Sequence, residues 1–226
     1  MKLKKIASLA LAGIMAVSML AGCKDGGNSN SGSSSENTNT ASGYSAMLGE
    51  AVSDKVKDMD YVTFSDNDKD KTALATAVKN VGSKDVYNAS SVGTLTPLGN
   101  TSAKAAFKDA AGLARDSILS GKVSIFKSVD PINQTVKVGE ILYIDGSMDV
   151  ATVMDFVAGK YNNALENLVD SETVTTNVGG SIVTMKVDYD YTISVSIVNV
   201  PATSNTTYIG SVNFIAVTVT RTPSQV

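Results

Sequence analysis

A long run of alternating apolar and polar residues, from position 183 to 197, constrains the fold of this chain more than any other feature. Every second position carries a large apolar side chain, and Thr, Ser, Lys or Asp stands between them. Successive side chains of a strand point to opposite faces of a sheet, so this period of two predicts a long β-strand with one buried face and one solvated face. The apolar set is Val183, Met185, Val187, Tyr189, Tyr191, Ile193, Val195 and Ile197.

A second β-like run follows at residues 208–222, after a turn region at residues 201–206. Two long strands with a short connection pair most simply as antiparallel neighbours. Within this run the apolar positions shift from Val212 and Phe214 to the odd-numbered positions from Ile215 onward. We expect either a β-bulge at the shift or a strand that is buried on both faces.

Four segments have the apolar spacing of helices. They are residues 47–59, 74–81, 101–121 and 149–169. The third has start and stop signals, with Thr101 or Ser102 as the expected N-cap and Gly121 at the expected end. Between the second and the third segment, residues 81–100 are expected to form an ordered loop or short strands.

The order of these segments predicts an α+β domain, with N-terminal helices followed by a twisted antiparallel sheet with one covering helix. Residues 44–122 are mainly helical by pattern, and residues 123–222 hold the β-like runs, which include 123–127 and 135–144. The helix expected at residues 149–169 has a strong apolar stripe and is therefore placed on one face of the sheet. The two regions are expected to form one compact domain.

The N-terminus has the composition of an export signal. Lys2, Lys4 and Lys5 precede an apolar run at residues 6–21. That run is shorter than the roughly 20 apolar residues of a stable membrane span and has the length of the apolar region of a signal peptide. Small residues end the run directly before Cys23, the only cysteine of the chain.

The segment Leu20-Ala21-Gly22-Cys23 resembles the lipobox of bacterial lipoproteins. The resemblance implies a signal peptide at residues 1–22, a diacylglyceryl group on the Cys23 thiol and cleavage that leaves this cysteine as the first residue. Two or more acyl chains would anchor the protein stably, whereas one chain holds only marginally. An ordinary secretory signal with a chance cysteine is the alternative interpretation.

Residues 23–43 then form the lipidated cysteine and a flexible linker. The segment is rich in Gly, Ser, Asn and Thr and has no large apolar residue, so it cannot bury enough surface to fold. As a coil it would span about 25 Å. Such linkers resemble those of Gram-positive surface lipoproteins. The expected location is therefore the cell membrane, lipid-anchored and facing outward, with a Gram-positive surface favoured.

Charge and composition exclude several function classes. Removal of the signal takes away three lysines and leaves sixteen cations against twenty-two acids, which moves the net charge from −3 to −6. Such a surface disfavours nucleic acids, which require clusters of Lys and Arg. The chain has no histidine, which excludes His-dependent triads and makes zinc sites unexpected. No cofactor is expected.

The acidic segment at residues 66–70 has the one-three-five spacing of a calcium loop, with Asp66, Asp68 and Asp70 as weak candidate ligands. It departs from the EF-hand pattern at Lys71, where a glycine belongs, and at Ala77, where a glutamate belongs. The favoured interpretation is a solvated turn whose carboxylates cap the following helix, and no metal site is predicted.

Two further short motifs are expected to be structural. Residues 145–147 (Asp-Gly-Ser) resemble part of the loop of haloacid-dehalogenase phosphatases, but Tyr143 stands where the nucleophilic aspartate would be. We interpret this segment as a glycine turn that leads into a capped helix. Ser124 and Lys127 match the S-x-x-K pattern of penicillin-recognising enzymes, yet they fall in a β-like run, where that match is a coincidence.

Asp188 and Asp190 share the polar face of the long alternating strand and lie about 7 Å apart by strand rise. Paired carboxylates at this separation can hydrolyse glycosides, and they can also simply keep an exposed face soluble. No catalytic residue is predicted beyond this weak pair.

Two function classes remain. The favoured one is a non-enzymatic, lipid-anchored extracytoplasmic lipoprotein that binds a small ligand or an envelope protein, or that takes part in envelope assembly. The alternative is a histidine-free hydrolase that uses Asp188 and Asp190 on envelope or extracellular glycans. The membrane, through the lipid anchor, is the expected partner in both cases.

Overall fold

A computed structural model describes residues 43–79, 81, 93–118, 124–127, 130–201 and 210–225, with the side chains of 176–178 and 225 left aside. Residues 1–22, Cys23 and the linker up to residue 42 lie outside the described residues. Residues Gly43–Val226 form one compact unit. Within the described ranges, no helix is both long and apolar enough to cross a membrane.

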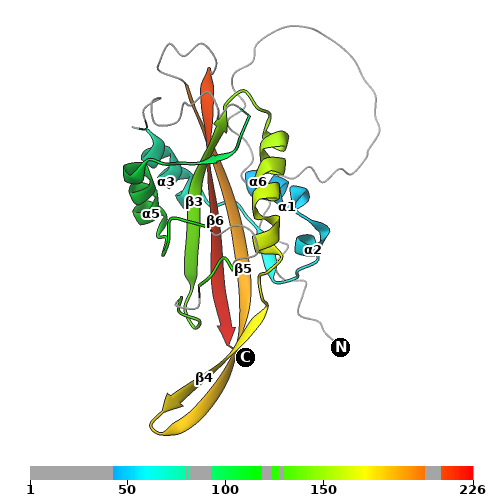
Figure 1. Cartoon of the computed structure of the whole chain (residues 1–226), viewed down its shortest axis with the longest axis vertical. Helices are drawn as coiled ribbons and strands as arrows, with labels where there is room; N and C mark the ends of the chain where they lie inside the picture. Colours follow the sequence, from blue (N-terminus) through cyan, green and yellow to red (C-terminus); the bar gives the residue numbers. More distant parts are fainter. Residues whose placement is uncertain are drawn as a thin grey trace. The chain divides into compact units, whose positions relative to one another are not determined.

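The centre of the molecule is a six-stranded sheet built on two long antiparallel strands, β5 and β6 (Figure 1). The strand order is β1-β5-β6-β3-β2, and β4 also pairs with β5. The strands are β1 (Val62–Phe64), β2 (Thr96–Pro97), β3 (Val136–Asp145), β4 (Ser171–Val178), β5 (Ser181–Pro201) and β6 (Ser211–Gln225).

Strand β6 is buried on both faces, which confirms one of the two alternatives that its apolar pattern left open. Its register with β5 runs without interruption from Pro201↔Ser211 to Val187↔Gln225, so the pair contains no bulge. The odd-numbered residues from Ile215 pack into one apolar cluster and the even-numbered residues from Val212 to Ala216 into another. A strand in this central position needs a cover on each side.

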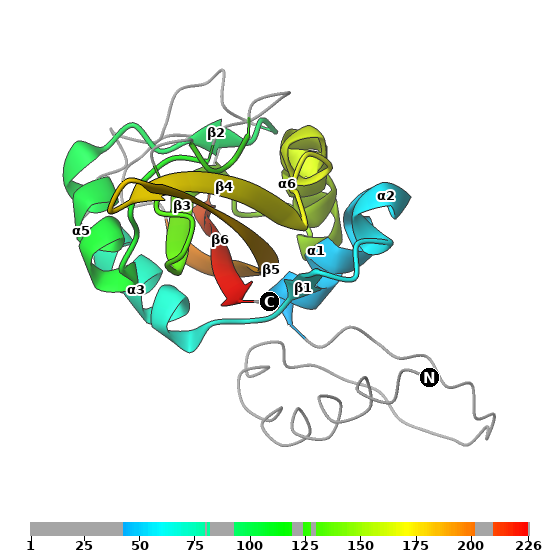
Figure 2. The same cartoon turned by 90° about the horizontal axis from the view of Figure 1, so that it is seen from below.

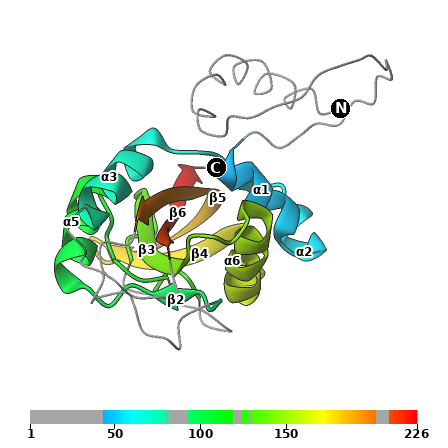
Figure 3. The ribbon, with the colours of Figure 1, turned by 90° about the horizontal axis from the view of Figure 1, so that it is seen from above.

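Helices supply both covers (Figures 2 and 3). On one face lie α1 (Tyr44–Ala51), α2 (Asp54–Lys57) and α6 (Val150–Leu165), whose buried residues join the larger cluster. On the other face lie α3 (Asp68–Val78) and α5 (Thr101–Ala111), with Phe107 and several alanines in the second cluster. The small side chains let these two helices approach the sheet and each other closely.

The α+β class is confirmed, whereas three finer features of the predicted fold are wrong. The helices form no separate N-terminal block, because β1 follows α2 and β2 precedes α5. The sheet is mixed, because β1 pairs in parallel with β5. Helices cover two faces and not one, because the second face carries small polar residues that are buried under α3 rather than solvated, including Ser194 and Thr218.

Side-chain caps fix where the helices begin. Asn67 accepts from the Asp70 N–H, Asn100 from the Ala103 N–H and Asp149 from the Thr152 N–H. Asn100 therefore caps α5 in place of the expected Thr101 or Ser102. This helix also ends earlier than predicted, at Gly112 with φ 74°, whereas the expected end at residue 121 lies outside the described residues.

The β4–β5 hairpin extends beyond the helical layers (Figure 1). A two-residue turn joins its strands, with Gly179 at φ 62° and Gly180 at φ 86°, as a type I′ turn requires. Val183 and Met185, which the alternation places on the buried face, are exposed here, because the hairpin leaves the helical cover.

Candidate functional site

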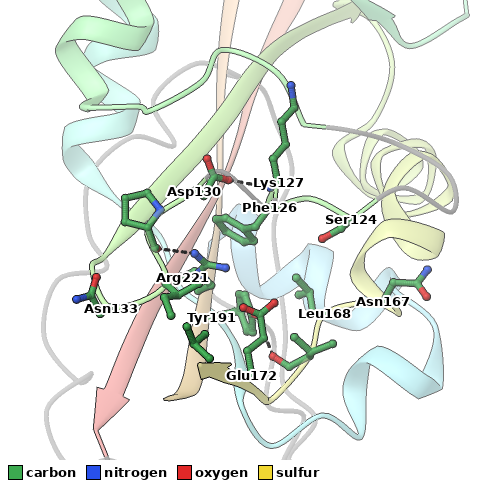
Figure 4. A pocket seen from close by; sticks show the side chains of 14 residues that line it. Ser124, Phe126, Lys127, Asp130, Asn133, Asn167, Leu168, Glu172, Tyr191 and Arg221 are labelled. Atoms are coloured by element: carbon green, nitrogen blue, oxygen red, sulfur yellow. Dashed lines mark hydrogen bonds between the residues drawn. The ribbon is translucent and has the colours of Figure 1, made fainter. Parts of the chain in front are cut away.

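A pocket of about 720 Å³ opens beside the middle of β5 and the C-terminal part of β6, on the face of the sheet that carries α6 (Figure 4). One wall is formed by residues 124–127 and 130–133, and the opposite wall by the end of the α6 region and β4. The lining residues are mixed in character, with apolar side chains between polar ones. They include Phe126, Ile132, Leu168, Val174, Tyr191 and Arg221, together with Ser124, Lys127, Asp130, Asn133, Asn167 and Glu172.

Arg221 is the central charged group of this pocket. It lies on β6 between its register partners Val136 and Tyr191 and is only 3% exposed. The guanidinium carbon lies 4.7 Å from the centroid of the Phe126 ring and 4.6 Å from that of the Tyr189 ring. A guanidinium packed against aromatic rings keeps its N–H edge for a ligand.

The charge of Arg221 is poorly balanced within the protein. Its Nη2 donates to the Pro131 carbonyl at 2.7 Å, and its buried Nε has no hydrogen-bond partner. Among the described residues, no carboxylate lies within ion-pair distance of Arg221. Burial of a charged group is costly unless it is paired and hydrogen-bonded, and stacking on two rings offsets only part of that cost.

The loop that carries Phe126 is held by the second arginine of the chain. Arg115 Nη1 donates to both carboxylate oxygens of Asp130 at 2.8 Å, and its Nη2 donates to the Ile125 carbonyl at 2.6 Å. Asp130 also accepts from the Lys127 N–H at 2.9 Å. Arg115 thus positions the Phe126 ring that covers Arg221.

The electrostatics of Asp130 follow from this arrangement. Partial burial alone would raise the pKa of Asp130, but the hydrogen bonds from Arg115 and the Lys127 N–H, with the charges of Arg115 and Arg221, lower it below the ordinary value. Asp130 is therefore ionised, and its hydrogen bonds hold it in the loop. It could not take up a proton near neutral pH.

The hydroxyls of the two tyrosines near Arg221 donate to fixed acceptors. Tyr189 Oη donates to Glu172 Oε2 at 3.1 Å, and Tyr191 Oη donates to the Val169 carbonyl at 2.9 Å. Burial raises the pKa of Tyr191, an effect that the charge of Arg221 opposes and the charge of Glu172 reinforces. Both tyrosines thus stay neutral and do not act as acids or bases, and of the two only Tyr191 lines the pocket.

The structure separates the three weak calcium candidates. Asp66 is exposed and accepts from the Ser45 N–H at 2.9 Å, and Asp68 is exposed in the first turn of α3. Asp70 is buried, where it accepts a hydrogen bond from Lys137 Nζ and another from Thr218 Oγ1 at 2.8 Å. Within the described ranges, no three acidic or cysteine side chains are placed to hold a metal ion.

Asp188 and Asp190 lie on the face of β5 opposite to Tyr189 and Tyr191 and do not line the Arg221 pocket. Asp190 is exposed, and Asp188 is partly exposed with Lys186 Nζ at 3.0 Å. Within the described residues, neither carboxylate lines one of the pockets described for this fold.

Of the two remaining sequence motifs, the one at residues 145–147 has the expected structural role. Asp145 Oδ1 accepts from the Ser147 N–H and hydroxyl, both at 2.8 Å, in the turn that leads into the Asp149 cap, as expected. Residues 124–127 are not a strand, which corrects the β-like interpretation for them; residue 123 lies outside the described residues. Ser124 and Lys127 line the pocket, and residues 124–127 are not helical, unlike the S-x-x-K motif of penicillin-recognising enzymes.

Sequence reasoning missed Arg221 and Arg115 as site residues. Arg221 stands between Thr220 and Thr222, a context typical of a solvated strand end. The one available signal is the scarcity of arginine, since both arginines of the chain converge on this pocket.

Comparison of the chain with protein-family models, with curated proteins and with solved structures gives no match. The folded region therefore has no recognised family, as its sequence indicated.

Proposed function

We propose that this protein is a non-enzymatic, lipid-anchored extracytoplasmic lipoprotein whose folded domain binds a small organic ligand in the Arg221 pocket. Anchoring rests on the lipobox resemblance that ends at Cys23 and on the basic and apolar residues before it. Binding rests on the pocket itself, whose volume lies in the range of small-molecule sites.

One observation carries the binding part of the proposal. Arg221 is almost fully buried on the pocket wall, and its Nε has no hydrogen-bond partner. A protein that needed Arg221 only for packing would gain stability from an apolar residue there or from a paired carboxylate. The Nε of Arg115 is also without a partner, but Arg115 is paired with Asp130, whereas Arg221 lines the cavity and has no described carboxylate at ion-pair distance. That combination is the arrangement expected of a binding group.

Binding is favoured over hydrolysis because the polar groups around the cavity are occupied in static roles. Asp130 is held by Arg115, and the hydroxyls of Tyr189 and Tyr191 donate to fixed acceptors. General acid–base catalysis requires a group that exchanges a proton near the operating pH. We therefore propose that the pocket binds a small ligand without catalysing a reaction, in preference to the hydrolase alternative.

The anchoring part is tested in living cells. Labelled palmitate is expected to join the wild-type protein and not Cys23→Ser, and the variant is expected to leave the membrane fraction for the medium. Equal labelling, or equal membrane retention without labelling, would contradict lipid anchoring.

The binding part is tested with the protein extracted from membranes in mild detergent. Its melting temperature is measured against a panel of amino acids, sugars, organic acids and amines. Val174→Trp is expected to fill the pocket and abolish every ligand-induced shift. Thr173→Trp is the matched control, because Thr173 is exposed and does not line the pocket. Shifts that survive in Val174→Trp would place binding elsewhere.

A further inference from the structure

We propose that the Arg221 pocket recognises the carboxylate of a small organic acid that has an apolar body. This inference rests on the proposed function, since it names the ligand class of the same site. The guanidinium of Arg221 would bind the carboxylate, and the apolar wall would contact the rest of the molecule.

The charge balance of the pocket favours an anion. Of the two acids that line it, Asp130 is neutralised by the bidentate contact with Arg115. Glu172 accepts from the Tyr189 hydroxyl, at the edge of the ring whose face covers Arg221. Arg221 has no described carboxylate at ion-pair distance. A ligand that supplied a negative charge would therefore complete the site.

The packing around the guanidinium favours a carboxylate. The ring centroids of Phe126 and Tyr189 lie 4.7 and 4.6 Å from the guanidinium carbon, so hydrogen-bond acceptors approach along its N–H edge. A planar edge pairs with two coplanar oxygens, which is the geometry of a carboxylate. Lys127 extends away from Arg221 (Figure 4), so Arg221 is the cation beside the apolar wall, and one carboxylate is enough to pair with it.

The walls favour an organic acid over an inorganic ion. Apolar side chains from three segments face the cavity next to Arg221: Ile132 from the loop, Leu168 from the end of the α6 region and Val174 from β4. The side-chain amides of Asn133 and Asn167 lie at opposite sides of the opening (Figure 4). Such a lining suits an apolar body and a few polar substituents.

The site is also held in advance of binding. Arg115 holds Asp130 and the Ile125 carbonyl, and Asp130 accepts from the Lys127 N–H. These contacts flank Phe126, whose ring lies against Arg221. Groups that need no rearrangement bind with a smaller loss of conformational entropy. Arg115 is accordingly a positioning residue, and Arg221 is the residue that contacts the ligand.

The test uses phenylacetate and its neutral analogue phenylacetamide as probes, with calorimetric titration of the detergent-extracted protein. Phenylacetate is expected to bind saturably, and phenylacetamide at least about ten-fold more weakly, because only the acid forms charged hydrogen bonds. Arg221→Gln is expected to reduce phenylacetate affinity by about ten-fold or more. The matched control is Lys186→Gln, which removes an exposed cation outside the pocket and is expected to leave affinity unchanged.

A second variant keeps the proposal testable if Arg221→Gln fails to fold, which circular dichroism would reveal. Glu172→Gln removes the pocket carboxylate that is not ion-paired with Arg115 and keeps an acceptor for the Tyr189 hydroxyl. It is expected to raise phenylacetate affinity several-fold and to leave phenylacetamide affinity unchanged, because less negative charge faces the ligand.

The outcomes separate this inference from the function on which it rests. Equal binding of both probes, or wild-type affinity in a folded Arg221→Gln, would overturn carboxylate recognition. If Val174→Trp still abolished binding in that case, the small-ligand function would stand. Absence of phenylacetate binding up to about 10 mM would also overturn the inference. Melting-temperature shifts with other compounds in the panel would then show whether the pocket binds any small ligand.

Discussion

Glu140 is a buried acid whose ionisation opposes folding. It lies on the α6 side of β3 with 9% of its surface exposed, and it accepts a hydrogen bond from the Tyr161 hydroxyl. Burial raises the pKa of Glu140, although the Tyr161 hydrogen bond and the charges of Lys160 and Lys104 act in the opposite direction. The folded protein therefore binds this proton more tightly than the unfolded chain, and stability falls as pH rises through the interval between the two pKa values.

Glu140→Gln is consequently expected to stabilise the protein at alkaline pH. Glutamine keeps an acceptor for Tyr161 and has no charge to desolvate, so the free energy of unfolding at pH 8 should rise by about 1 kcal/mol. Near pH 4 both forms are neutral and the difference should vanish. Urea unfolding at the two pH values measures it, with Asp155→Asn on the exposed side of α6 as control. A variant less stable than wild type at pH 8 would contradict this account.

Asp70 differs from Glu140, because its buried carboxylate is paired with a partly buried cation. Only 1% of it is exposed, and it accepts from Lys137 Nζ and from Thr218 Oγ1. Asp70→Ala leaves the Lys137 ammonium without this partner, and the expected loss is about 3–5 kcal/mol of unfolding free energy. Denaturant midpoints measure the loss. The neighbouring exposed Asp68→Ala should change stability by less than about 0.5 kcal/mol.

A double variant separates the ion pair from general damage to α3. Asp70→Ala combined with Lys137→Met removes both charges, so it should recover a large part of the loss caused by Asp70→Ala alone. If the two single losses simply added in the double variant, the carboxylate and the ammonium would not be coupled.

At the scale of elements, the turn of the β4–β5 hairpin depends on glycine. Gly179 has φ 62°, a conformation that costs about 1–2 kcal/mol for a residue with a β-carbon and most for a β-branched one. Gly179→Val is expected to open the hairpin, and the backbone amides of β4 should exchange with solvent about ten-fold faster or more. Gly179→Asn is the control, since asparagine tolerates this conformation in type I′ turns. Equal exchange in both variants would contradict the turn assignment.

The strands and helices themselves were the most predictable elements. The alternation of residues 187–197 predicted the buried face of β5, and the apolar stripe after Asp149 predicted that α6 packs on the sheet. Periodicity reports local structure only, so it could not show that the β4–β5 hairpin carries Val183 and Met185 of β5 beyond the helical cover. It also could not show that the α3 helix covers Ser194, because a small polar residue in a strand pattern predicts a solvent-exposed position.

At the scale of the whole molecule, the pocket depends on contacts that no local pattern contains. Arg221 meets Tyr189 because β5 and β6 are paired, and it meets Phe126 because Arg115 holds the loop that carries this ring. These partners lie far apart in sequence, and their residue types are common in ordinary cores. The sequence therefore predicted candidate carboxylates, which are conspicuous in a one-dimensional pattern, and not the buried cation.

The compact unit that begins at Gly43 sets where the chain can be shortened. A protein that starts at Gly43 keeps every described element, so its melting temperature should match that of the full chain. A protein that starts at Asp54 loses α1 and the residues after it, which include the buried Leu48 and Val52. It also loses Ser45, whose Oγ accepts from the Val195 N–H at 2.9 Å.

Loss of each of those two apolar side chains lowers the free energy of unfolding by about 1.5–3 kcal/mol. The Val195 N–H is also left without its acceptor inside the core. The protein that starts at Asp54 should therefore melt at least about 10 °C lower, or remain unfolded, as followed by circular dichroism. Because the two proteins differ only in residues 43–53, the comparison isolates α1 from the segment before it. Equal melting temperatures would mean that α1 contributes nothing to the fold. A fall in the protein that starts at Gly43 would mean that residues 1–42 stabilise the domain.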